Sequence, residues 1–160
     1  MKLRNLSCIA ICFAIAGGAV RAGSVDVAFV HPEAFTDVRD QNLDAAPNLQ
    51  TIAEYLQSLG QKYLPANQSL QVDVLNVDLA GKLHPSRRWG WVRIVGGQLD
   101  WPRMTLNYRL VENGTVLASG QDAIADMAYS SHLDSYPGWE TLESEKRMLR
   151  DWFRSRFVHP

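Results

Sequence analysis

Cysteine is almost absent from this sequence: its two copies, Cys8 and Cys12, both lie in one apolar run near the N-terminus. The rest of the chain therefore has no cysteine for a disulfide, a thiol nucleophile or a thiolate metal site. The sequence also lacks a Gly-rich phosphate loop, a dinucleotide fingerprint and a Gly-x-Ser-x-Gly elbow. A folded domain with this composition must be stabilised by its core alone, and no motif assigns it a reaction.

Histidine is also sparse, and its spacing does not fit a metal site. The four copies are His31, His84, His132 and His159. They do not form the pair, four residues apart on a helix, that many zinc sites use. Ser131, His132 and Asp134 have the side-chain types of a catalytic triad, but residues this close in one loop rarely reach its geometry. We predict no metal and no cofactor.

The one long apolar run, Leu6–Val20, has 15 residues, fewer than the ~20 that a membrane-spanning helix needs. Basic residues precede the run and small residues follow it, which is typical of a secretory signal peptide. We predict a signal peptide over residues 1–22, cleaved between Ala22 and Gly23, and a periplasmic or secreted protein. An uncleaved N-terminal anchor is the alternative, and the mature chain has no predicted membrane span.

Cleavage would leave residues 23–160, and these 138 residues suit one domain with a single core. Three of the 16 basic residues leave with the signal peptide, so 13 basic and 17 acidic residues give the mature chain a formal charge of −4. An acidic chain of this kind argues against general nucleic-acid binding.

The strongest local signal is Asn113-Gly114, which separates two runs of alternating apolar and polar residues. Asn-Gly in this position predicts a β-hairpin with a two-residue turn. In that register Leu110 pairs with Leu117 on the core face of the sheet. The alternation fails past Gly120, where we predict a bulge.

Periodicity predicts a helix on each side of the hairpin in the sequence. The first begins near Asp44, and its apolar residues recur at steps of three and four: Leu49, Ile52, Leu56, Leu59 and Tyr63. The second runs from about Thr141 to Phe157, and its apolar side contains Leu142, Leu149, Trp152, Phe153 and Phe157.

Further strands are predicted over Val25–Val30, Leu70–Leu79 and Trp91–Val95, and residues 80–90 are predicted to be a loop. A change of apolar phase within Leu70–Leu79 predicts a bulge or a centre buried on both faces. The order of elements predicts an α+β fold, with a mainly antiparallel sheet of four or five strands and both helices on one face. Whether the first two long strands are parallel is left open.

Four segments together resemble one bacterial family. They are residues 35–40 (Phe-Thr-Asp-Val-Arg-Asp), 77–81 (Val-Asp-Leu-Ala-Gly), 100–103 (Asp-Trp-Pro-Arg) and 145–153 (Glu-Lys-Arg-Met-Leu-Arg-Asp-Trp-Phe). With the signal peptide and the opening strand, they are similar to the family catalogued as domain of unknown function 3016, over nearly the whole mature chain. The resemblance implies an exported, periplasmic protein of Gram-negative bacteria. It implies no activity, because the family has none assigned.

Residues 37–40 place two carboxylates and a guanidinium in one loop: Asp37, Arg39 and Asp40. The carboxylates could take acid and base roles, or bind a cation through oxygen ligands together with Asn42. The alternative, which is the commoner behaviour of such residues, is that they cap turns and that Arg39 pairs with one of them.

Residues just before the hairpin are a second candidate site. Arg103 and Arg93 could grip an anionic group while Trp101 stacks against it. The alternative is structural: Trp101 covers the edge of the core, and Asp100 accepts backbone hydrogen bonds.

The most unusual composition is that of residues 87–91, where Arg87, Arg88, Trp89 and Trp91 surround one glycine. Indoles stack and guanidiniums pair with anions, so this segment could meet a membrane surface, a glycan or a peptide. In the alternative, Trp91 points inward and the two arginines are only solvated.

These observations predict a non-enzymatic binding or accessory protein of the bacterial envelope, with an envelope protein, a peptide or a glycan as its partner. A small hydrolase that uses Asp37, Asp40 or Asp100 is one alternative. A structural envelope protein that self-associates through an exposed hairpin or edge strand is another.

Overall fold

The computed structural model describes residues 22–97, 99–131 and 142–158. Apart from Ala22, the predicted signal peptide lies outside these residues, as do His132, Asp134 and His159. Within the described ranges, no helix combines the length and the apolar character needed to cross a membrane.

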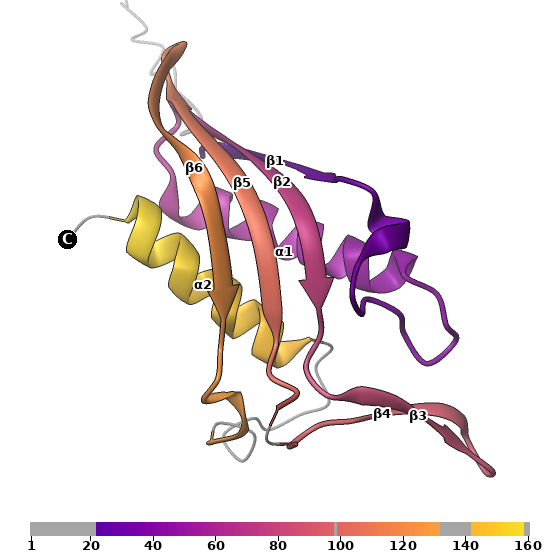
Figure 1. Ribbon diagram of the computed structural model, residues 1–160. Helices are drawn as coiled ribbons and strands as arrows, with labels where there is room; N and C mark the ends of the chain where they lie inside the picture. The colour runs from indigo at the N-terminus through magenta and orange to yellow at the C-terminus, as the bar shows by residue number, and fades with distance from the viewer. Residues whose placement is uncertain (1–21, 98, 132–141, 159–160) are drawn as a thin grey trace, which may run out of the picture.

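The fold is α+β, as predicted, and is built on a four-stranded sheet with the order β1-β2-β5-β6. β1 (Ser24–Phe29) and β2 (Gln68–Asp78) are parallel, which answers the question that the sequence left open. β5 (Arg103–Glu112) and β6 (Thr115–Ala125) continue the sheet with antiparallel pairs. Figure 1 shows α1 (Ala46–Tyr63) and α2 (Glu143–Phe157) packed on the same face of this sheet.

The β5–β6 hairpin turns at Asn113 and Gly114, as predicted, with φ angles of 49° and 84°. The predicted register was wrong by one residue over most of its length, because Leu110 pairs with Ala118 and not with Leu117. The irregularity lies beside Leu117, close to the turn, and not past Gly120. This irregularity has the effect that the predicted bulge was meant to have, because it places the apolar residues at the end of β6 on the core side of the sheet.

The core lies between the sheet and the two helices. Its fully buried side chains come from β2, β5, α1 and α2, and include Leu70, Val72, Val74, Leu106, Ile52, Leu56, Leu149 and Phe153. Phe153 lies in the C-terminal half of α2, and its ring contacts those of Tyr63, Trp152 and Phe157 at centroid distances of 6.2, 6.2 and 5.1 Å. Each helix therefore buries the apolar stripe that its periodicity predicts.

Local interactions position both helices against the sheet. α1 begins at Ala46, two residues later than predicted, and the carboxylate of Asp44 accepts a hydrogen bond from the Ala46 amide at 3.0 Å. Gly60 allows α1 to approach β1 closely, because a Cβ atom there would lie 2.3 Å from Val25. α2 is joined to β6 through Asp122, which accepts a hydrogen bond from the Trp152 indole at 2.8 Å.

Residues 80–90 were predicted to be a loop, and this prediction was wrong for half of them, because a second, two-stranded sheet begins there. β3 (Lys82–Ser86) pairs antiparallel with β4 (Gly90–Ile94), so half of that segment is a strand. Pro85, which argued against a strand, is tolerated because β3 pairs on one side only. Figure 1 shows this pair, which we call the ribbon (Lys82–Ile94), extending beyond the end of the main sheet and away from both helices.

Candidate functional site

The ribbon is attached to the domain by the side chain of Arg93. Its guanidinium donates to both carboxylate oxygens of Asp37, at 2.9 and 3.0 Å. It also donates to the carbonyl oxygens of Arg39 at 2.8 Å and of Ala80 and Gly81 at 3.3 Å. The Arg93 and Asp37 side chains are 15% and 16% exposed, so water screens this ion pair only weakly. Arg93 thus fixes the direction in which the ribbon leaves the domain.

A second ion pair lies where β2 ends and the ribbon begins. The Asp78 carboxylate is 3% exposed and accepts from Lys82 at 3.2 Å on one oxygen and from Arg103 on the other. The Arg103 guanidinium also lies 5.8 Å from the centre of the Trp101 ring. Arg103 and Arg93, predicted to grip one anion together, are each engaged with a different carboxylate.

Asp100 joins the chain that follows β4, at the base of the ribbon, to the loop after β6. Its carboxylate accepts hydrogen bonds from the Gly97 amide at 3.1 Å and from the Tyr129 hydroxyl. The same hydroxyl accepts a hydrogen bond from the Gly96 amide at 2.8 Å. Tyr129 is 2% exposed, and this burial raises the pKa of its hydroxyl group. Asp100 therefore accepts a backbone hydrogen bond, as the structural alternative for this residue describes.

A buried carboxyl group that sequence reasoning missed completes this region. Glu145, in the first turn of α2, is 3% exposed and accepts a hydrogen bond from the Ala80 amide at 2.7 Å. Burial raises the pKa of Glu145, and the hydrogen bond from Ala80 and the charge of Arg93 oppose this shift. The signal was present, because Glu145 lies four residues before Leu149 and so falls on the apolar side of the helix.

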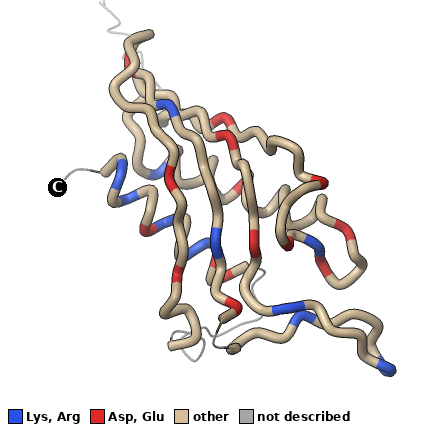
Figure 2. The backbone as a smooth tube through the Cα atoms, viewed as in Figure 1, with Lys and Arg blue, Asp and Glu red and all other residues tan. Residues whose placement is uncertain are grey.

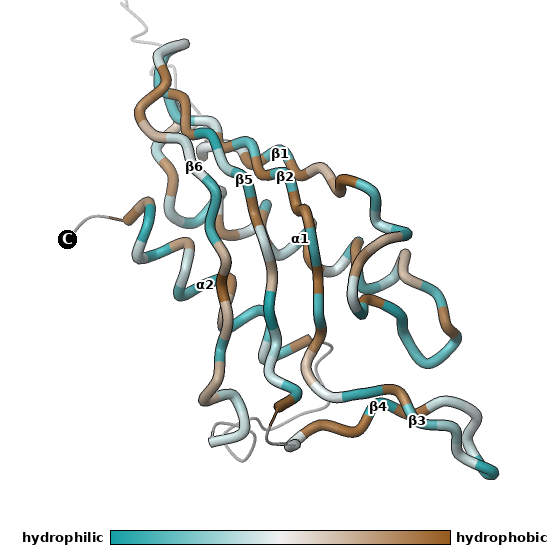
Figure 3. Tube along the Cα trace, viewed as in Figure 1, coloured by the Kyte–Doolittle hydropathy of each residue, from teal (hydrophilic) through white to brown (hydrophobic). Residues whose placement is uncertain are grey.

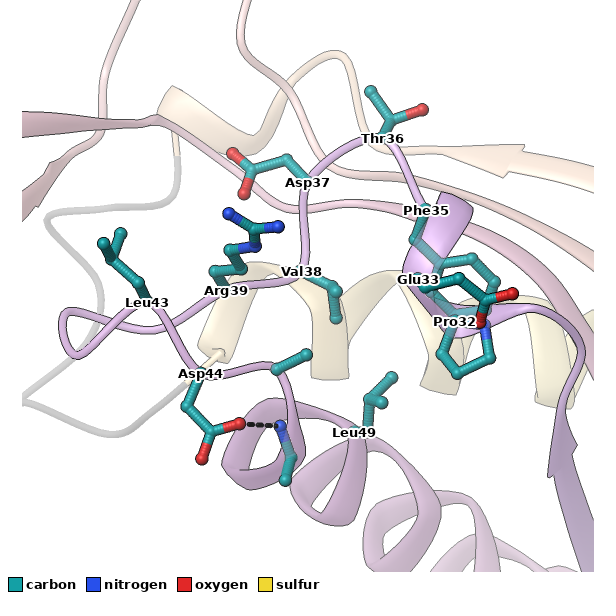
Figure 4. A pocket seen from close by; sticks show the side chains of 12 residues that line it. Pro32, Glu33, Phe35, Thr36, Asp37, Val38, Arg39, Leu43, Asp44 and Leu49 are labelled. Atoms are coloured by element: carbon teal, nitrogen blue, oxygen red, sulfur yellow. Dashed lines mark hydrogen bonds between the residues drawn. The ribbon is translucent and has the colours of Figure 1, made fainter.

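The loop after β1 forms one wall of an open cleft of about 750 Å³, shown in Figure 4. Asp37 and Arg39 both line this cleft, and Figure 4 shows their charged groups on the same side of the loop. Asp40 instead caps its own turn, accepting from the amides of Asn42 at 2.8 Å and Asp44 at 2.9 Å. These bonds, above all that from Asp44, lower the pKa of Asp40.

The free end of the ribbon holds the basic and aromatic residues that the sequence singled out. Arg87, Arg88 and Trp89 form the turn between the strands, and the Arg88 guanidinium lies 5.1 Å from the centre of the Trp89 ring. Trp89 is 70% exposed and Trp91 is 37% exposed. Figure 3 shows a hydrophobic stretch along the end of β4 and beyond it, where Ile94 is 55% exposed.

The structure thus places most of the predicted site residues in two groups. Asp37, Arg93, Asp100 and Arg103 make ion pairs or hydrogen bonds at the base of the ribbon, whereas Arg87, Arg88 and Trp89 lie at its tip. Among the described residues, no three His, Cys, Asp or Glu side chains are grouped as metal ligands would be.

The sequence matches the family described as "Protein of unknown function (DUF3016)" over residues 23–155. The chain belongs to the DUF3016 family. This confirms the resemblance drawn from four short segments. All four contribute to the region just described: Asp37 and Arg39 are in the first, Asp78 in the second, Arg103 in the third and Glu145 in the fourth. The chain matches no curated protein. In this DUF3016 chain, most of the predicted site residues lie on the ribbon or at its base.

Proposed function

We propose that this protein is an exported, non-enzymatic binding protein of the bacterial envelope, and that it engages an anionic partner through the β3–β4 ribbon. The observation that carries the proposal is the composition of the ribbon together with its exposure. Between Leu79 and Leu99 the chain has four basic residues and no acidic residue. Two tryptophans lie in the same segment, and Trp89 is largely exposed at its tip.

The base of the ribbon supports a binding role because it holds the ribbon in place. A two-stranded ribbon alone is only marginally stable in water. Here the ion pairs Arg93–Asp37 and Lys82–Asp78 tie both strands to the main domain. A partner would then meet a surface that is already ordered, so binding would cost less conformational entropy.

The carboxylates considered for a hydrolase are each engaged with different groups. Asp37 pairs with Arg93, Asp40 caps the turn that follows it, and Asp100 binds Gly97 and Tyr129. The pKa of Asp40 is lowered, which does not suit a general acid near neutral pH. These arrangements favour the binding proposal over the hydrolase alternative.

Photo-crosslinking in intact cells tests the proposal. A photoreactive amino acid would replace Trp89 at the ribbon tip or, as a matched control, Leu117, which is 49% exposed at the other end of the sheet. We expect adducts with a partner molecule from position 89, none from position 117 except with a second copy of this chain, and loss of the position-89 adducts when Arg87 and Arg88 are changed to Gln. No adduct at position 89, or the same adducts from both positions, would contradict the proposal.

Export is tested separately by mass spectrometry of the protein from fractionated cells. We expect a periplasmic or secreted form of the protein whose first residue is Gly23. An intact 160-residue chain found only in the cytoplasm would contradict it.

A second candidate function is self-association through β6. This strand is at the edge of the sheet, its residues from Thr115 to Gln121 are exposed, and it contains no lysine or proline to discourage pairing. Its one charged residue, Asp122, is engaged by Arg156. Sedimentation at several concentrations would show a dimer that Gln121→Lys weakens, whereas a monomer at all concentrations would exclude this candidate.

A further inference from the structure

We infer that the anionic partner of the ribbon is the surface of a phospholipid bilayer, with Arg87 and Arg88 on the phosphate groups and Trp89 in the interface below them. This inference rests on the proposed function and names the chemistry of the partner. The observations that carry it are the distribution of charge, the placement of the exposed apolar side chains and the lack of sugar-binding side chains on the ribbon.

Charge is distributed unevenly between the ribbon and the rest of the chain. Four of the 13 basic residues after position 22 lie between Leu79 and Leu99, which leaves 9 basic and 17 acidic residues elsewhere in the mature chain. Lys82 and Arg93 pair with Asp78 and Asp37 at the base of the ribbon, so its uncompensated charge is that of Arg87 and Arg88 at the tip. Figure 2 shows only blue segments along the ribbon, whereas both blue and red segments are present on α2 and on the main sheet. An anionic surface would therefore attract the ribbon and repel the rest of the domain, which sets one orientation.

Exposed apolar residues are concentrated in the same segment. Of the ten large apolar residues exposed in the described parts of the chain, five lie between Trp89 and Leu99: Trp89, Trp91 and Ile94 on the ribbon, and Val95 and Leu99 after it. Indole rings favour the region between lipid headgroups and acyl chains, since one side of the ring is apolar and its N–H can remain hydrated. The ribbon thus combines the two attractions that hold a peripheral protein on an anionic membrane.

The exposed apolar groups point in several directions. In the observed register Trp91 and Ile94 fall on opposite faces of the ribbon, because side chains alternate along a strand, and Trp89 lies at the turn. A flat protein surface would cover only one of these faces. A bilayer interface is fluid and surrounds an inserted tip, so it can solvate Trp89 and Trp91 without a preformed groove, while Ile94 pairs with Lys82 at the base of the ribbon.

The ribbon has no carboxylate or amide side chain to bind the hydroxyl groups of a sugar. Residues 79–97 contain no Asp, Glu, Asn or Gln, the usual carboxylate and amide partners of sugar hydroxyl groups. Guanidinium and ammonium groups only donate hydrogen bonds, which matches phosphate oxygens, since these only accept. The hydrogen-bonding chemistry therefore favours a phosphate headgroup over a glycan.

Vesicle binding by the purified protein, in the form that cells produce, tests this inference. The probes are vesicles of phosphatidylglycerol mixed with phosphatidylcholine, and vesicles of phosphatidylcholine alone. Each basic residue near an anionic surface contributes about 1 kcal/mol, or about fivefold, so Arg87→Gln with Arg88→Gln should weaken binding to the anionic vesicles about 30-fold. Binding should also fall steeply with added salt.

A second double variant controls for the change in net charge. Arg109 and Arg154 are exposed, and their side chains make no hydrogen bond or ion pair within the described residues. Arg109→Gln with Arg154→Gln removes the same two charges and should weaken vesicle binding less than about threefold. Equal losses in the two double variants would overturn the inference.

Tryptophan fluorescence locates the contact. Anionic vesicles should shift the emission of the wild-type protein to shorter wavelength, and brominated lipids should quench it, because Trp89 enters the interface. Trp89→Phe should lose most of the shift, while Trp152, which is 6% exposed in the core, reports that the fold is intact.

Failure of this inference and failure of the proposed function give different results. If the protein does not bind anionic vesicles but position 89 crosslinks to a protein in cells, the partner is an acidic protein. In that case only the lipid inference is wrong. If it binds neither, both are wrong. Equal binding to neutral and anionic vesicles would also overturn the lipid inference.

Discussion

Replacing Arg93 by alanine should detach the ribbon from the domain at a measurable cost in stability. The side chain makes five hydrogen bonds, two of them to the Asp37 carboxylate. Breaking a buried ion pair by removing one partner costs about 3–5 kcal/mol, because the other charge is left uncompensated. Asp37 is 16% exposed, so some water reaches it, and we expect a loss of about 3 kcal/mol, at the low end of that range.

Thermal and urea unfolding, followed by circular dichroism, measure this loss. Unfolding entropy is about 2.1 cal/mol/K per residue, or about 0.3 kcal/mol/K for a domain of this size, so 3 kcal/mol lowers Tm by about 10 °C. Arg109→Ala is the control, since this arginine is exposed on β5 and its side chain forms no ion pair with the residues described. Hydrogen exchange should also become faster in β3 and β4 of the Arg93 variant than in the control.

A double-mutant cycle separates the ion pair from other effects of the substitution. Asp37→Asn and Arg93→Gln should each destabilise the protein, and the double variant should be more stable than their sum predicts, with a coupling energy of about 2 kcal/mol. If Arg93→Ala lowers stability no more than Arg109→Ala does, to within about 0.5 kcal/mol, the assigned role of the ion pair is wrong.

Three further substitutions test other parts of the account. Burial raises the pKa of Glu145 above its ordinary value of 4.5, so the folded state keeps a proton that the unfolded chain loses as pH rises, and stability falls through that window. Glu145→Gln should therefore leave Tm unchanged near about pH 4 and raise it relative to wild type near about pH 8; a difference that is constant with pH would contradict this. Phe153→Ala should cost about 4 kcal/mol in urea unfolding, because it leaves a cavity in the centre of the core, and a loss below about 1 kcal/mol would show that the core is assigned wrongly. Gly114→Ala should cost about 1–2 kcal/mol, since φ is 84° there and a Cβ atom would meet no neighbour within 4 Å, whereas unchanged stability would show that the turn relaxes.

Amphipathic periodicity was sufficient to predict the helices and, together with the Asn-Gly turn, the hairpin. The stripe through Ile52, Leu56 and Leu59 is buried in α1, and Asn113-Gly114 forms the turn between β5 and β6. These features depend on side chains within a few residues of each other, so the pattern along the chain contains the information that they need. The register past Leu117 was mispredicted because one irregular position in a strand shifts every later pair.

The structure at the base of the ribbon could not be predicted, because it is formed by contacts between residues far apart in the sequence. Arg93 pairs with a carboxylate 56 residues earlier, and Glu145 accepts from an amide 65 residues earlier. β3 was missed because its strand character comes from pairing with β4, while its proline and the glycine beside it indicate a loop.

By itself, the sequence determined the two helices and the strands of the main sheet, where the hairpin turns, and that one segment is basic, aromatic and free of acidic residues. Tertiary structure alone decided that this segment is a ribbon extending from the domain, and which carboxylates hold it there. The physical reason is range: propensity and periodicity act between near neighbours, whereas ion pairing and burial depend on which distant residues the fold brings together.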